Sequence, residues 1–129
     1  MKELIELEFV LPVSPKLLYH LISTEEGLSK WFADRVIILN QNISFYWSKQ
    51  RIDAKILAQK ENKFVKYAWL EDIENKNNCY FEIAIHSTNE NSTTIKITDF
   101  SDPEEKNENI ILWNTHIDKL KRAIGINHS

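Results

Sequence analysis

Apolar and polar residues alternate along most of this chain, and a period of two residues is typical of strands with one buried face. The first such segment covers residues 5–11 and stops at Pro12. The later segments cover residues 35–39, 42–48, 52–58, 65–69, 80–86 and 95–99. Asparagine-rich turns separate most of them and no helical segment intervenes, which favours antiparallel pairing of neighbouring strands.

Helical periodicity occurs only near the two ends of the chain. Ser14 and Pro15 suit the start of one short helix, and Thr24 suits the N-cap of a second. A longer helix is expected over residues 104–124. Its apolar residues recur every three or four positions and make one stripe: Ile110, Trp113, Ile117, Leu120 and Ile124. An antiparallel sheet that ends in one long helix usually wraps that helix, so an α+β fold is expected, with core or a pocket between them.

The length, net charge and composition exclude several classes of protein. With 129 residues the chain has the length of one domain, and we expect residues 1–129 to form it. The net charge of −3 lacks the basic excess of nucleic-acid-binding proteins. The lone Cys79 fits a reducing compartment, and no apolar stretch approaches the roughly 18 residues of a membrane span. We therefore expect a cytoplasmic protein without nucleic-acid or membrane partners.

Motifs for cofactors and metals are missing from the sequence. With only two glycines, the chain cannot build a glycine-rich phosphate loop, and it carries no nucleophile-elbow motif. Neither a cofactor nor a metal is expected, because none of the four histidines has a partner at metal-ligand spacing. We expect His20 and His116 on helix surfaces or in satisfied contacts between elements.

Three segments of the chain together carry a family resemblance. Residues 15–32 contain a proline-led helix, a short acidic turn and a Leu-x-x-Trp-Phe motif. Residues 65–69 form a strand ending in tryptophan, and residues 97–100 precede the helix with Trp113 and Leu120. In these features the chain resembles the helix-grip proteins of the START-like superfamily (SRPBCC), and most of all the branch of Aha-type chaperone-activator homology domains.

The resemblance implies a helix-grip fold. In this fold a curved antiparallel sheet of six or seven strands and two short N-terminal helices wrap one long C-terminal helix, with a cavity between sheet and helix. The superfamily contains lipid carriers, cyclases, hydroxylase domains and chaperone cofactors, so the resemblance implies a fold rather than an activity. Residues 33–35 lack the second tryptophan and the Gly-Pro often found there in the Aha-type branch.

The candidate ligand-binding residues share positions that the alternation or the helical stripe turns inward. Large rings at such positions either fill a core or line a pocket for an apolar ligand with a polar group. The set consists of Trp47, Tyr67, Trp69, Ile97, Asp99, Trp113 and Ile117.

Asp99 is the one acidic residue of this set. It shares a strand face with Ile95 and Ile97, so it is expected to point toward the helix, where a carboxylate needs polar partners. Such a group suits a ligand anchor or an acid in a chemical step. The alternative is that the strand has already ended and that Asp99 belongs to the cap before Pro103.

Three functions agree with these observations. The first is a binding protein that holds an apolar or amphipathic small molecule, such as a lipid, between the sheet and the C-terminal helix. The alternative is a protein-interaction or chaperone-cofactor module with a solid core, and residues 5–11 as an edge strand would also permit a homodimer. An enzyme of cyclase or hydrolase type ranks last, because it needs two titratable groups in the cavity and Asp99 is the only one expected there.

Overall fold

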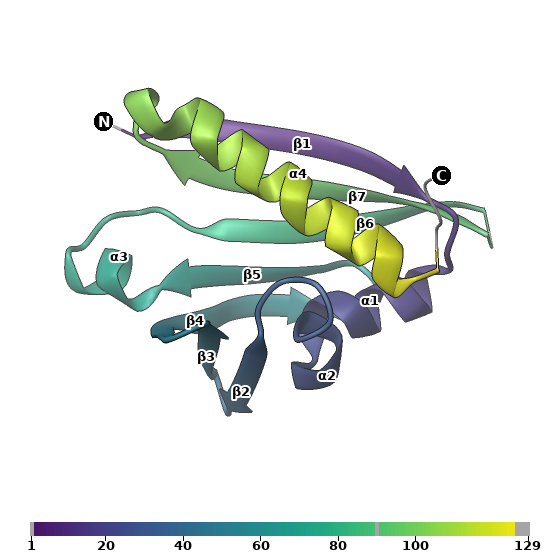
Figure 1. Ribbon diagram of the computed structural model, residues 1–129, viewed down its shortest axis with the longest axis horizontal. Helices are drawn as coiled ribbons and strands as arrows, with labels where there is room; N and C mark the ends of the chain where they lie inside the picture. Colours follow the sequence, from purple (N-terminus) through teal and green to yellow (C-terminus); the bar gives the residue numbers. More distant parts are fainter. Residues whose placement is uncertain (1, 90, 126–129) are drawn as a thin grey trace.

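Seven strands form a single antiparallel sheet in the order β1-β7-β6-β5-β4-β3-β2, as Figure 1 shows. The computed structural model describes residues 2–89 and 91–125. Successive strands from β2 to β7 are neighbours, so this part of the sheet is a meander. The strands are β1 (Glu3–Leu11), β2 (Arg35–Leu39), β3 (Asn42–Trp47), β4 (Gln50–Lys60), β5 (Phe64–Trp69), β6 (Phe81–Asn89) and β7 (Ser92–Ser101).

The first strand closes one edge of the sheet by pairing with the last. β1 runs antiparallel to β7, with Glu3 opposite Ser101 and Leu11 opposite Thr93. The chain must then cross to the other edge, where β2 begins, and it does so through the short helices α1 (Pro15–Ser23) and α2 (Glu25–Leu28). The Ser14 hydroxyl accepts a hydrogen bond from the backbone N–H of Leu17 and caps α1 as the sequence predicts.

One long helix crosses a face of the sheet. A single turn of 3₁₀ helix, η1 (Pro103–Glu105), leads into α4 (Lys106–Ala123), which runs diagonally over the strands (Figure 1). Its predicted apolar stripe is confirmed, because Trp113, Ile117 and Leu120 are buried against the sheet. The C-terminal half of α4 thus packs on a continuous core, and the predicted α+β helix-grip arrangement is confirmed.

Two local features depart from the sequence prediction. The expected run of inward residues over 52–58 breaks at a bulge between Ile56 and Ala58, so Ala58 is exposed rather than inward. A short helix, α3 (Leu70–Glu74), follows β5 directly where no helix was expected. This helix brings Glu71 and Asp72 next to the end of β5.

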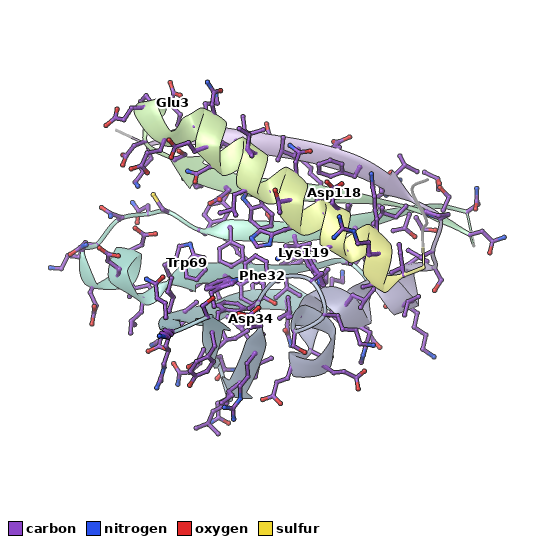
Figure 2. All side chains as sticks on the ribbon, viewed as in Figure 1. Glu3, Phe32, Asp34, Trp69, Asp118 and Lys119 are labelled. Atoms are coloured by element: carbon purple, nitrogen blue, oxygen red, sulfur yellow. The ribbon has the colours of Figure 1, made fainter. Side chains whose placement is uncertain are left out.

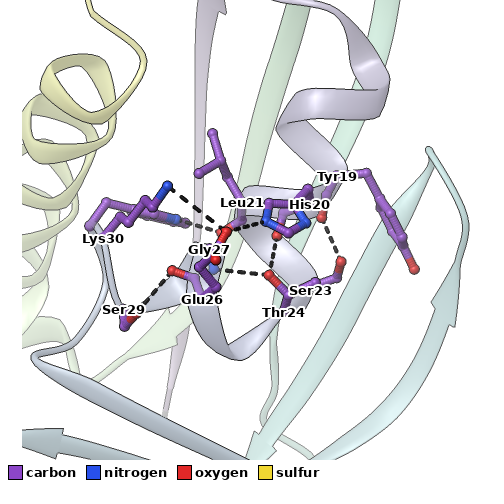
Figure 3. Close-up of polar contacts among 10 residues, drawn as sticks. Tyr19, His20, Leu21, Ser23, Thr24, Glu26, Gly27, Ser29 and Lys30 are labelled. Atoms are coloured by element: carbon purple, nitrogen blue, oxygen red, sulfur yellow. Dashed lines mark hydrogen bonds and ion pairs between the residues drawn. The ribbon is translucent and has the colours of Figure 1, made fainter.

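The α1–α2 junction depends on a close backbone approach at Gly27. The Thr24 hydroxyl donates to the His20 carbonyl at 2.8 Å and accepts from the Gly27 N–H at 2.9 Å (Figure 3). A Cβ atom at position 27 would lie 2.2 Å from the His20 carbonyl oxygen and 2.6 Å from the Cα of Leu21. Only glycine fits here, because both obstructing atoms belong to the backbone.

We expect Gly27→Ala to lower the free energy of unfolding by about 3 kcal/mol, because the added methyl group must push two helices apart. Gly125→Ala is the matched control. Nothing lies within 4 Å of a Cβ built on Gly125. The φ of 85° at this position is unfavourable for alanine, so Gly125→Ala should lower the free energy of unfolding by about 1 kcal/mol. Urea denaturation of both variants checks the difference, and equal losses would contradict the close approach at Gly27.

Candidate functional site

A pocket lies at one end of the sheet, beside the N-terminal half of α4. Neighbouring strands are antiparallel, so β3, β5 and β7 end at the same edge of the sheet at which β4 and β6 begin. Residues at these three strand ends and two strand starts line the pocket. Its volume is about 590 Å³, within the range of small-molecule sites. The lining is completed by α3, by one face of α4 and by Phe32 after α2.

Aromatic rings form the wall on the sheet side. Trp47 and Trp69 lie with ring centroids 6.3 Å apart, and Phe32 lies 5.5 Å from Trp47. Trp113 of α4 approaches Phe32 at 5.7 Å, so the rings continue from the sheet to the helix. Trp47 is fixed in place because its indole N–H donates to the Phe32 carbonyl at 2.8 Å. Figure 2 shows Phe32 and Trp69 below α4. These rings offer an apolar surface of fixed shape.

Asp99 joins the sheet to the helix across this pocket. Its Oδ2 accepts a hydrogen bond from the Trp113 indole N–H at 2.8 Å, and its Oδ1 accepts from the Phe100 backbone N–H at 2.7 Å. Burial raises the pKa of Asp99, while these two hydrogen bonds act in the opposite direction. β7 continues to Ser101, so the interpretation of Asp99 as part of a cap after the strand is wrong.

His116 is a polar residue of the pocket, whereas the sequence predicted it on a helix surface or in a satisfied contact between elements. It is 7% exposed, lines the pocket one turn after Trp113, and packs 4.9 Å from the ring of Phe32. Burial lowers the pKa of His116 to about 4, and the nearby charge of Lys119 adds to the effect. Its ring is therefore neutral at pH 7. Its Nδ1 is buried without a hydrogen-bond partner among the described residues.

The seven candidate residues divide between pocket and core. Trp47, Trp69, Asp99 and Trp113 line the pocket. Tyr67, Ile97 and Ile117 are buried in the core beyond it and do not contribute to its wall. Tyr67 donates its hydroxyl proton to the Ile22 carbonyl at 2.6 Å, so its polar group ties the sheet to α1. Ligand binding by the first four stays a prediction.

Several lining residues were outside the predicted set, although the sequence held a signal for some of them. His116 precedes Ile117 and follows Trp113 by three positions, which places it at the margin of the apolar stripe. Tyr80 and Phe100 flank the strand ends, with ring centroids 5.0 Å apart. No signal marked Phe32 as a pocket residue, because an aromatic in a buried turn is normally plain core.

Neither a cluster of metal-ligating side chains nor a membrane-spanning helix occurs in the described part of the chain. Over residues 2–89 and 91–125, no three His, Cys, Asp or Glu side chains are grouped so that they could hold a metal ion. Within the same ranges, every helix is too short or too polar to cross a bilayer.

Comparison with known proteins agrees with this architecture. A family model described as a START-like superfamily domain matches residues 1–126. This chain belongs to the START-like superfamily. None of the curated proteins is similar enough to match it.

Several solved structures share the fold. The solution structure of BfR322 from Bacteroides fragilis is 35% identical, with a TM-score of 0.65, and the match covers 99% of this chain and 95% of that one. The solution structure of the Aha1 dimer from Colwellia psychrerythraea has a TM-score of 0.83 at 19% identity, covering 98% and 99%. MLL2253 from Mesorhizobium loti has a TM-score of 0.76 at 14% identity, covering 98% and 100%. The resemblance to Aha-type domains is thus confirmed at the level of the fold.

Proposed function

We propose that this START-like domain binds an aromatic or amphipathic small molecule in the pocket beside α4. The single observation that carries the proposal is a pocket of about 590 Å³ whose aromatic wall is interrupted by two polar groups, the partly buried Asp99 and the buried His116. Apolar surface drives such binding at roughly 25 cal/mol per Å² buried, and a few polar groups fix the orientation of the ligand. We place the whole activity in one domain spanning residues 1–129.

The arrangement of the aromatic rings supports binding over plain packing. A core residue is surrounded on all sides, whereas Trp47 and Trp69 remain partly exposed where they border the pocket. Three of the four tryptophans, Trp47, Trp69 and Trp113, line this space. Intrinsic tryptophan fluorescence therefore reports directly on occupancy of the pocket.

A ligand screen tests the proposal. The protein is incubated with a panel of lipids, aromatic compounds and polyketide-like compounds, and melting is followed by fluorescence while native mass spectrometry detects complexes. At least one class should raise the melting temperature, because a ligand bound only to the folded chain stabilises it. Absence of both stabilisation and complex formation across the panel would overturn the proposal.

We expect Trp69→Ala to weaken the best ligand of that panel about tenfold, which corresponds to about 1.4 kcal/mol of lost ring contact. Trp69 contributes one large part of the pocket wall, and its indole makes no hydrogen bond within the described residues. Tyr46→Ala is the matched control, because Tyr46 precedes Trp47 on β3, faces the other side of the sheet and lies 5.6 Å from Arg35. Fluorescence titration measures both, and an equal effect of the two substitutions would place the ligand elsewhere.

The alternative of a protein-interaction module has one observation in its favour. Ile111 of α4 is 65% exposed and does not line the pocket, so a partner that covers this side of the helix would bury apolar surface. The relative from Colwellia psychrerythraea is described as a dimer, and a homodimer of this chain stays a prediction. Sedimentation of the purified protein tests it.

A further inference from the structure

We propose that the pocket selects ligands in which an ammonium group is joined to an aromatic body, with the ammonium against Asp99 and the ring against the wall formed by Trp47 and Trp69. This inference rests on the proposed function and adds the charge class of the ligand. It is carried by a carboxylate that is partly buried, lies on the pocket wall and has no ion-pair partner within the described residues.

Asp99 retains hydrogen-bonding capacity toward the pocket. An ionised carboxylate accepts about four hydrogen bonds, and the Trp113 and Phe100 N–H groups supply two. Both donors are neutral, so they orient the carboxylate without balancing its charge. A primary ammonium group brings three donors and a full positive charge, and hydrogen bonds between charged partners are about twice as strong as neutral ones.

The charged groups around the pocket favour a cation at this end. The acidic side chains Glu71, Asp72 and Asp99 line it, against Lys2 and Lys119. The Lys2 ammonium is already 3.5 Å from the Asp102 carboxylate. Lys119 lies six residues beyond Trp113, about 9 Å further along the helix axis. The negative charge of Asp72 adds to burial in raising the pKa of Asp99, and the positive charge of Lys2 acts in the opposite direction, as a bound cation would.

The aromatic side chains of the pocket wall suit a positively charged ligand. Aromatic faces attract cations, and the attraction is strongest for tryptophan in places shielded from water. Trp113 contacts Asp99 through its side chain and lines the pocket, so a cation next to Asp99 also lies near the Trp113 indole.

His116 provides a second, independent indication of a polar ligand. It lies on the pocket wall, it is 7% exposed, and the lack of a partner for Nδ1 leaves a buried polar atom unsatisfied. Such an atom costs free energy until something hydrogen-bonds to it. Because the pKa of His116 is lowered to about 4, its ring adds no positive charge at pH 7 that would repel an ammonium group.

Three probes with one aromatic body test the inference at pH 7: phenylpropylamine, phenylpropanol and phenylpropionate. Isothermal titration calorimetry and tryptophan fluorescence give their affinities for the unmodified protein. We expect the amine to bind about tenfold more tightly than the alcohol, and the carboxylate to bind most weakly. This comparison needs no variant and so does not depend on how any substitution folds.

A pair of variants locates the selectivity. In Asp99→Asn the advantage of the amine over the alcohol is expected to fall to about twofold or less, because the shape persists and the charge is removed. Asp118→Asn removes the same charge from an exposed position on α4 outside the pocket and should keep the tenfold advantage. Figure 2 labels Asp118 and Lys119 on this helix.

Each other result overturns a definite part of the argument. Equal binding of amine and alcohol, or tightest binding of the carboxylate, overturns the ammonium preference and leaves the proposed function standing. The same holds if none of the three binds while another compound of the screening panel does. If neither the probes nor the panel bind, the proposed function falls as well.

Discussion

Trp31→Ala is expected to lower the free energy of unfolding by about 4 kcal/mol, the typical cost of removing a large buried ring. Trp31 is 2% exposed and packs edge-on against Phe32 at 5.5 Å. Its indole N–H also donates to the Leu21 carbonyl at 2.7 Å, near the C-terminal end of α1, where helix carbonyls lack internal partners. The substitution therefore removes core volume and leaves a buried acceptor unsatisfied. Urea denaturation followed by circular dichroism measures the loss.

Two further variants separate these contributions. Trp31→Phe keeps a buried ring but loses the hydrogen bond, so about 2 kcal/mol of destabilisation is expected. Ile111→Ala removes an apolar side chain from a 65% exposed position on α4 and should change stability by about 0.5 kcal/mol or less. A Trp31→Ala loss no larger than that of Ile111→Ala would contradict the role of Trp31 in joining α1 to the core.

Acidification should destabilise the protein through His116. Its pKa is about 4 in the folded chain and about 6.5 in the unfolded chain, where the ring is solvated. Between these two pH values the unfolded chain binds a proton at His116 and the folded chain does not. The free energy of unfolding therefore falls as the pH drops through the window from 6.5 to 4, by about 3 kcal/mol in total. Asp99 acts in the opposite sense, because its pKa is raised and the folded chain therefore takes up a proton on this carboxylate before the unfolded chain does. Denaturation at pH 7.5 and at pH 5 measures the effect.

His116→Phe is the variant that tests this assignment. A phenyl ring retains the contacts with Phe32 and Trp113 and cannot be protonated, so most of the loss of stability between pH 7.5 and pH 5 should disappear. His86→Phe changes an exposed histidine on β6 in the same way and should keep the dependence of the unmodified protein. If His116→Phe keeps the full dependence, another group is responsible.

The positions of strands and helices were predictable because burial leaves a periodic trace. The alternation over residues 5–11 corresponds to β1, and the stripe of Trp113, Ile117 and Leu120 is the buried face of α4. The bulge after Ile56 was not predictable, because one extra residue shifts the pairing without changing the composition. α3 has five residues, which is too short for helical periodicity to emerge.

The candidate site was predictable only in part. Residues on the same face of a strand can lie either in the core or in the pocket wall, and the alternation does not distinguish the two. Tyr67 and Trp69 are two residues apart on one face of β5, yet Tyr67 is in the core while Trp69 lines the pocket. The difference lies in where β5 ends relative to α4, and alternation carries no information about that. His116 was misjudged for a different reason. Its residue type suggests an exposed position, whereas the packing of Trp31 and Phe32 against α4 encloses it.

The pocket occupies the ends of the strands, whereas Leu18, Ile22 and Leu120 are fully buried in the core. The residues of the core and the residues that line the pocket thus form largely separate sets within one small domain. Substitutions at the strand ends can alter what is recognised while the cooperative folding unit persists. For protein engineering, this makes Trp47, Trp69 and the adjacent turn of α3 a place where randomised libraries retain foldable members.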